Sequence, residues 1–186
     1  IMPSLVGSEM CIRDSGVTFG LRDAFGNVAD HDSSTQASLA LASGTGVLSG
    51  SVLTVTASGG VLSFSGLSLS LVGSKTLQAT SAGLTAATSS AMAVTPGAPT
   101  ALALRTDAPA EVVAGNQFSV AFDVLDVFGN LCTAASNLVS VSLTGGTASS
   151  VAGTTVRSPV DGVVLFNDLW VELVGIGLVI TAAAAG

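Results

Sequence analysis

Apolar and polar residues alternate with a period of two along several short segments of the chain. Phe118, Val120, Phe122 and Val124 alternate with smaller or more polar neighbours, as in a strand that buries one face. The same spacing recurs at positions 17–21, 67–71 and 169–173. No segment carries a sustained apolar stripe at helical spacing. The pattern predicts an all-β chain of short antiparallel strands arranged as a sandwich.

Two stretches of the sequence occur twice. VTFGLRDAFGN at 17–27 and VAFDVLDVFGN at 120–130 share six of eleven positions at an offset of 103. GVLSFSGLSLSLVG at 60–73 and GVVLFNDLWVELVG at 162–175 share seven of fourteen positions at an offset of 102. Because the two matches keep their order and spacing, they predict two tandem domains.

A proline- and glycine-rich cluster, Pro96-Gly97-Ala98-Pro99, lies between the two copies. Proline lacks an N–H donor and fixes its own φ, so the cluster predicts a linker at a domain boundary. We therefore predict repeat 1 over residues 16–96 and repeat 2 over 97–186. The apolar tail at 173–186 aligns with LVGSKTLQATSAG at 71–83, which predicts a strand pair around a glycine turn and not a membrane span.

Composition narrows the classes of function. Charged residues make up 9% of the chain, against about 25% in an ordinary soluble domain, and the net charge is -7. The few Lys and Arg residues are scattered, whereas nucleic acids and anionic membranes bind clustered cations. Nucleic acid is therefore excluded as an expected partner.

Several short motifs follow one another in a fixed order. Asp126-Val127-Phe128-Gly129-Asn130 and Gly162-Val163 have counterparts at 23–27 and 60–61 of the first copy, which closes on Val94-Thr95-Pro96-Gly97. Residues 16–186 resemble bacterial immunoglobulin-like repeats of the invasin and intimin type. The resemblance implies two tandem immunoglobulin-like sandwiches in a secreted or cell-surface protein, acting as a stalk, spacer or adhesive array. It implies neighbouring repeats as partners, with a host or surface protein or a glycan as further partners. It implies no catalytic residues and no cofactor.

The repeated D-x-F-G-N segment has a physical interpretation of its own. The carboxylate of Asp23 or Asp126 is expected to accept backbone hydrogen bonds within a turn. Phe25 or Phe128 is then expected to pack on the core, and the Gly-Asn pair that follows tolerates positive φ.

Residues suited to catalysis are scarce. His31 is the only histidine and tyrosine is absent, so we predict no enzymatic activity and assign no catalytic, cofactor-binding or metal site. Asp23, Asp30 and Asp32 lie within ten residues and could supply oxygen ligands to calcium. We favour a solvated acidic turn, with the calcium site as the alternative.

Trp170 and Cys132 are the two remaining candidates. Trp170 has an outward phase where the first copy has Ser68, which favours covering a sheet edge or neighbouring domain over contacting a sugar or a partner. Cys132 aligns with Ala29 and is interpreted as a free thiol in a loop. If Trp170 contacts a sugar, the chain is an accessory carbohydrate- or protein-binding module of a secreted enzyme, which is the alternative to a stalk.

The N-terminal segment differs from the rest of the chain. Residues 1–15 share nothing with LRTDAPAEVVAGNQF at 104–118, which the repeat offset places opposite them. LVGSEMCIRDS at 5–15 resembles the translation of a transposon-type sequencing adapter, and we interpret residues 1–15 as non-native. We therefore expect repeat 1 to lack its N-terminal strand and repeat 2 its C-terminal strand, with both edges prone to association.

Overall fold

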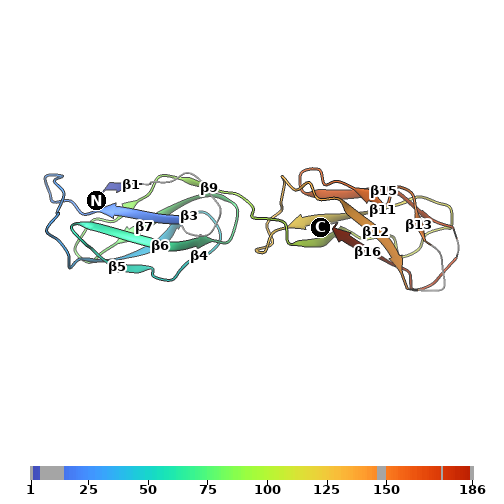
Figure 1. Ribbon diagram of the computed structural model, residues 1–186, viewed down its shortest axis with the longest axis horizontal. Helices are drawn as coiled ribbons and strands as arrows, with labels where there is room; N and C mark the ends of the chain where they lie inside the picture. Colours follow the sequence, from blue (N-terminus) through green and yellow to red (C-terminus); the bar gives the residue numbers. More distant parts are fainter. Residues whose placement is uncertain (1, 5–14, 146–149, 173, 185–186) are drawn as a thin grey trace. The chain divides into compact units, whose positions relative to one another are not determined.

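The computed structural model describes residues 2–4, 15–145, 150–172 and 174–184 (Figure 1). The chain divides into two compact units, Ile1–Thr95 and Pro96–Gly186, here called repeat 1 and repeat 2. The division falls at the start of the proline-rich cluster. The described residues form strands, turns and loops, and none lies in a helix long and apolar enough to cross a membrane.

The described residues of repeat 1 form nine strands in two antiparallel sheets. In chain order they are β1 (Met2–Ser4), β2 (Ser15–Gly20), β3 (Gln36–Ser43), β4 (Leu48–Gly50), β5 (Thr54–Thr56), β6 (Val61–Leu69), β7 (Gly73–Thr80), β8 (Ala87–Thr88) and β9 (Met92–Val94). One sheet has the order β1-β2-β6-β4. The other has the order β5-β3-β7-β8, and β9 also pairs with β7.

Repeat 2 has a similar arrangement, with seven strands in the part of it that the structure describes. They are β10 (Ala101–Thr106), β11 (Phe118–Leu125), β12 (Val139–Thr144), β13 (Val151–Ala152), β14 (Val156–Arg157), β15 (Val163–Val171) and β16 (Val179–Ala184). The sheet orders are β10-β11-β15-β13 and β14-β12-β16. The sheet β1-β2-β6-β4 of repeat 1 and the sheet β10-β11-β15-β13 of repeat 2 correspond strand by strand. Both have the A-B-E-D strand order of the immunoglobulin fold. The prediction of two tandem immunoglobulin-like antiparallel sandwiches is confirmed.

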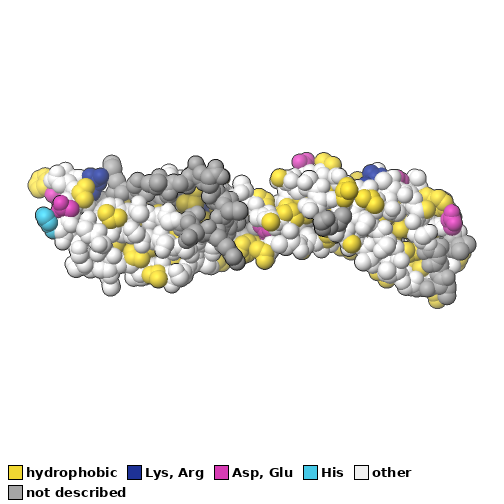
Figure 2. Space-filling view, viewed as in Figure 1, with side chains coloured by type: hydrophobic (Ala, Val, Ile, Leu, Met, Phe, Trp, Pro, Cys, Tyr) yellow, Lys and Arg dark blue, Asp and Glu magenta, His cyan; other side chains and the backbone are white. Residues whose placement is uncertain are grey.

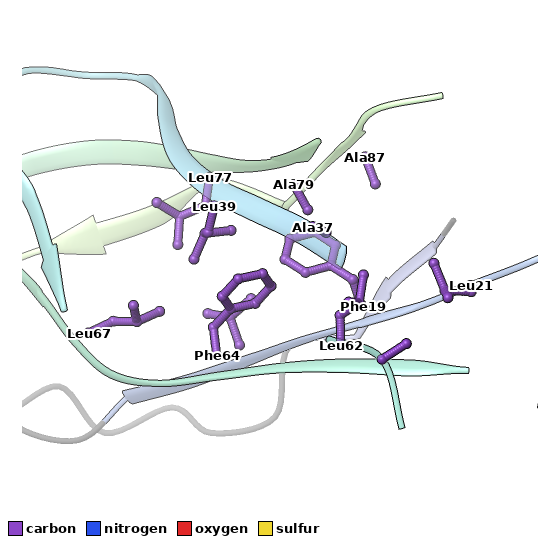
Figure 3. Close-up of a cluster of buried hydrophobic side chains, with 12 residues drawn as sticks. Phe19, Leu21, Ala37, Leu39, Leu62, Phe64, Leu67, Leu77, Ala79 and Ala87 are labelled. Carbon is purple, nitrogen blue, oxygen red and sulfur yellow. The ribbon is translucent and has the colours of Figure 1, made fainter. Parts of the chain in front are cut away.

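Each repeat has a hydrophobic core between its two sheets. Figure 3 shows Phe19, Leu62 and Phe64 of one sheet of repeat 1 facing Leu39, Leu77 and Ala79 of the other. The rings of Phe19 and Phe64 meet edge to face at 6.1 Å, and those of Phe122 and Phe166 in repeat 2 at 6.4 Å. Such pairs add to the stabilisation that comes from burying the rings. The period-two alternation predicted this burial, because β15 buries every second residue along most of its length.

The two repeats differ in length at two loops. Phe19 corresponds to Phe122 and Phe64 to Phe166, so repeat 1 has one more residue between the second strand and the sixth. That residue lies in the loop that contains Asp30, His31 and Asp32. The offset returns to 103 in the last paired strand, because Leu41 pairs with Leu77 where Leu143 pairs with Ile180. Repeat 2 therefore has one more residue in the loop before β16.

The sheet edges differ from the expectation for the two ends of the chain. Repeat 1 was expected to lack its N-terminal strand, and the structure places β1 antiparallel to β2 over three residues, where β10 pairs with β11 over a longer stretch. Residues 5–14, which carry most of the adapter-like segment, lie outside the described residues. The strand pair predicted within 173–186 is wrong for the described residues 174–184, which hold the single strand β16 paired with β12.

We predict that the two repeats unfold separately, because each is stabilised by its own aromatic pair. Phe166 is fully buried, so Phe166→Ala should lower the unfolding free energy of repeat 2 by about 3–5 kcal/mol. Urea denaturation followed by the fluorescence of Trp170 measures this repeat, because Trp170 is the only tryptophan. Phe64→Ala is the matched control in repeat 1. An equal shift of the Trp170 transition by Phe64→Ala would contradict separate cores.

Candidate functional site

The two D-x-F-G-N turns have nearly the same internal geometry. In repeat 1, Asp23 Oδ1 accepts hydrogen bonds from the N–H groups of Phe25 and Asn27, each at 2.9 Å, and Oδ2 accepts one from Asn27 Nδ2 at 3.0 Å. In repeat 2, Asp126 makes the corresponding bonds with Phe128 and Asn130, each at 2.9 Å. The aspartate thus satisfies the donors of its own turn, as predicted.

The glycine of each turn meets the conformational requirement that the sequence suggested. Gly26 and Gly129 have φ of 87° and 81°, a region that glycine adopts without steric cost. The asparagine does not share this role: Asp161 is the only non-glycine residue with positive φ in the part of the chain that the structure describes. Asn27 and Asn130 instead donate side-chain hydrogen bonds to the aspartate.

The phenylalanine of the turn does not pack on the core, so that prediction is wrong. Phe25 is 91% exposed and Phe128 is 44% exposed. The aspartate draws the backbone N–H two residues ahead toward its carboxylate, which places the phenylalanine at the tip of the turn. The alternation of apolar and polar residues along the preceding strand therefore ends at the aspartate. It does not predict whether the phenylalanine of the turn is buried.

In repeat 2 the turn is also hydrogen-bonded to the linker. The N–H of Gly97 donates to Asp126 Oδ2 at 2.9 Å, and the thiol of Cys132 lies 3.5 Å from the carbonyl oxygen of Gly97. Three residues later, the N–H of Thr100 donates to the carbonyl of Leu125 at 2.8 Å. The linker is thus held against the end of β11. Asp126 is 2% exposed, whereas Asp23 is exposed.

The electrostatics of the two aspartates follow from these contacts. Burial acts to raise the pKa of Asp126, but the hydrogen bonds from Asn130, Gly97 and Phe128 outweigh it, and the pKa lies below its ordinary value. The side-chain bond from Asn27 is the main cause of the lowered pKa of Asp23. Both carboxylates are therefore ionised at neutral pH. Their oxygens are already engaged by donors of the turn, so the arrangement fixes backbone and does not present a free acid or base.

The proposed calcium ligands of repeat 1 do not converge. Asp32 accepts hydrogen bonds from the Thr35 hydroxyl, and from the N–H groups of Ser34 and Thr35 at 2.9 Å, which lower its pKa to about 2. Asp30 Oδ1 instead lies 3.3 Å from Nε2 of the fully exposed His31. Over residues 2–4, 15–145, 150–172 and 174–184, no three His, Cys, Asp or Glu side chains gather as metal ligands would. Asp32 is thus held by donors of its own turn, and the solvated acidic turn stays a prediction.

The remaining two candidates occupy structural positions. Cys132 is a free thiol in a loop, as predicted, but it is 3% exposed and belongs to the core of repeat 2. Burial, with the nearby charge of Asp126, raises the pKa of its thiol, so the reactive thiolate is disfavoured. Trp170 is half-buried and pairs with Ala152 of the short strand β13. In Figure 2 the charged side chains on the visible face of repeat 1 gather at one end beside the histidine, and those of repeat 2 are spread out.

Gly97 is the functional residue that sequence reasoning missed. It was assigned only to the linker, and its bond to Asp126 joins residues 29 positions apart. No repeat or periodicity of the sequence signals this contact, because the Val94-Thr95-Pro96-Gly97 segment occurs only once.

Comparisons with known proteins give likeness at the level of structure only. No protein-family profile matches the chain, and no characterised protein has a similar sequence. The D0-D1 domain of intimin is 14% identical, with a TM-score of 0.35 over 99% of this chain and 89% of that one. A β-glycosidase from Bacteroides vulgatus is 16% identical, with a TM-score of 0.36 over 98% of this chain and 24% of that one. Because these sequence identities and TM-scores are low, the fold is described from the sheet topology of this chain alone.

We predict that the two turn aspartates differ in their importance for stability. Each Asp126 oxygen accepts two hydrogen bonds, so Asp126→Asn places an amide group against two donors, which should lower the unfolding free energy of repeat 2 by about 1–3 kcal/mol. Asp23→Asn is the matched control and should cost less, because water replaces the lost bonds at its exposed turn. Urea titrations read by Trp170 fluorescence for repeat 2 and far-ultraviolet circular dichroism for the whole chain measure the two effects.

We predict that the Asp126 carboxylate also makes the stability of repeat 2 depend on pH. The lowered pKa of Asp126 in the folded state means that its stabilising contribution is present above the ordinary aspartate pKa and is lost as the pH falls below it. The parent protein should therefore lose more stability than Asp126→Asn between about pH 5 and pH 3. Equal losses in the two proteins would show that the Asp126 carboxylate does not carry the stabilisation.

Proposed function

We infer that the chain is a non-catalytic spacer, two immunoglobulin-like repeats from a large secreted or cell-surface bacterial protein. The observation that carries this proposal is the hydrogen bond from Gly97 to Asp126. Val94, the last residue of β9, pairs with Gly73 in repeat 1, and Gly97 is already bound by repeat 2. Thr95 and Pro96 are the two residues between these anchored positions.

A short connection that contains proline favours an array in which the connections between repeats are stiff. Pro96 fixes its own φ and restricts the residue before it, so few backbone rotations are left between the two anchored residues. A long glycine-rich linker would allow each repeat to move as an independent bead. We propose that the partners of each repeat are the neighbouring repeats of the same chain, and that the linker bond sets the stiffness of the connection.

The chemistry of the described side chains supports a structural role. The aspartates of the D-x-F-G-N turns bond to their own turns, the buried thiol is protonated, and the acidic loop of repeat 1 is held by its own backbone. None of these groups presents an unoccupied acid, base or nucleophile in a cleft. An adhesive role, with a host or surface protein or a glycan as ligand, would act through the exposed turns and not through a catalytic site.

An accessory binding module of a secreted enzyme is the second candidate. The observation that favours it is Phe25, which is 91% exposed at the tip of its turn, since exposed aromatic rings bind sugars and partner surfaces. Trp170 supports it less than the sequence suggested, because the ring is half-buried beside β13. Specific glycan binding that is lost in Phe25→Ala or Trp170→Ala would favour this candidate over the spacer.

The spacer proposal predicts that the two repeats tumble together in solution. Nitrogen-15 relaxation of the whole chain should give one anisotropic correlation time, longer than that of a single repeat of about half the mass. A Gly/Ser-rich insertion between Thr95 and Pro96 is the matched control, because it keeps both anchors and should shorten the correlation time. Relaxation in the parent that already equals that of the insertion variant would overturn the proposal.

A further inference from the structure

The tight turn that leads into β15 contains a strained residue. Asp161 has a φ of 50°, in the left-handed region, and the other described residues with positive φ are all glycines. Gly162, which follows it, has a φ of 79°. Two successive residues with these φ values are typical of a type I′ hairpin turn, for which Asp-Gly is a preferred pair. The Cβ of Asp161 still makes the left-handed conformation more costly for it than for glycine.

Backbone hydrogen bonds hold this turn closed. The N–H of Val160 donates to the carbonyl of Val163 at 2.8 Å, and the N–H of Val163 donates to the carbonyl of Val160 at 2.9 Å. The N–H of Val124 donates to the carbonyl of Gly162 at 2.8 Å, which ties the turn to the neighbouring strand β11. Gly162 is buried, whereas Asp161 is exposed at the tip of the hairpin.

The dipeptide at the tip differs from every other aspartate in the chain. Asp161 is the one aspartate that glycine follows. A glycine has no side chain to hinder an approach to its backbone nitrogen, so an aspartyl side chain reacts most readily with the nitrogen of a following glycine. Repeat 1 has Gly59-Gly60 at the corresponding positions, with φ of 56° and 75°. The two repeats therefore share the turn, but only repeat 2 has a carboxyl group in it.

We propose that Asp161-Gly162 is a site of spontaneous covalent modification, at which Asp161 converts to isoaspartate. The nitrogen of Gly162 bonds to Cγ of Asp161, and the hydroxyl of the carboxyl group leaves as water with the proton of that nitrogen. The product is a succinimide ring. Water then adds to the main-chain carbonyl carbon of Asp161, the bond from this carbon to the nitrogen of Gly162 breaks, and the nitrogen regains a proton. One water is lost and one is gained, and the chain now runs through the side chain of Asp161.

The closed hairpin controls when the ring can form. Ring closure brings Cγ and the nitrogen of Gly162 to the same side of the Cα–C bond of Asp161. The hydrogen bonds between Val160 and Val163 oppose this rotation, since they fix the backbone on both sides of the turn. Conversion therefore proceeds from molecules in which the hairpin has opened, and its rate follows the population of that open state.

The product does not fit the closed turn. A Cβ on Gly162 would already lie 2.9 Å from the carbonyl oxygen of Cys132 and 2.9 Å from Cγ of Leu131. Isoaspartate adds one atom to the backbone at this crowded point, immediately before Val163, the first residue of β15. Because β15 carries the fully buried Phe166, a displaced turn destabilises the core of repeat 2. The modification thus limits the lifetime of the folded repeat 2 and leaves repeat 1 intact.

Ageing the whole chain in oxygen-18 water tests the proposal, because each ring opening adds one oxygen-18 atom to the residue. Trypsin cleaves after Arg157 and meets no later Lys or Arg, so residues 158–186 are released as one peptide. Fragmentation of this peptide should locate the label at Asp161. Asp168 lies in the same peptide and precedes Leu169, so it is the internal control and should stay unlabelled. Chromatography should separate the aspartate and isoaspartate forms of the peptide.

Two further measurements test the hairpin's part in the reaction. Unfolding the chain in guanidinium chloride should speed conversion by at least about tenfold, which corresponds to an opening free energy of about 1.4 kcal/mol or more. Converted chains should unfold at a lower denaturant midpoint, read by Trp170 fluorescence. Asp161→Gly, which introduces the residue of repeat 1, is the matched control and should keep its midpoint on ageing.

Four results would overturn the proposal. They are no label at Asp161 in the aged folded chain, labelling of Asp168 at the same rate, equal conversion rates in the folded and unfolded chain, and an unchanged unfolding midpoint in converted chains.

Discussion

The carboxylate of Asp126 joins three parts of repeat 2: the end of β11, the turn that follows and the linker that precedes the domain. A buried carboxylate is costly unless donors satisfy it, and here the N–H groups of Phe128, Asn130 and Gly97 and the amide of Asn130 do so. Because the donors come from both the turn and the linker, all four hydrogen bonds form only when these two segments are in place. Folding of the domain and placement of its linker are thereby coupled.

The duplicated sandwich keeps its core and varies its loops. Phe19 with Phe64, and Phe122 with Phe166, are the same inter-strand contact made twice. The two length differences fall in the acidic loop of repeat 1 and in the loop before β16 of repeat 2, where no core residue has to shift. Divergence between the repeats is thus concentrated where a repeat meets its surroundings.

Much of the fold could be predicted from the sequence, because alternation of side chains and the repeat offsets are local or internal properties. The exposure of Phe25 and Phe128 could not be predicted, since the strand periodicity ends at the aspartate and the turn changes the direction of the side chains that follow. The burial of Asp126 and Cys132 depends on Gly97, a contact between distant positions that no periodicity encodes. The single strand of the tail was mistaken for a strand pair because the aligned glycines suggested a hairpin, whereas the segment crosses between the two sheets.

The central claim is that repeat 2 binds its own linker through Asp126, and amide hydrogen exchange at Gly97 tests it directly. Residue-resolved exchange by NMR should show the Gly97 amide protected in the parent protein, with Gly115, whose N–H bonds to Val171, as an internal reference. In Asp126→Asn the protection at Gly97 should fall while that at Gly115 remains. Exchange of Gly97 at the rate of an unstructured peptide in the parent protein would contradict the claim.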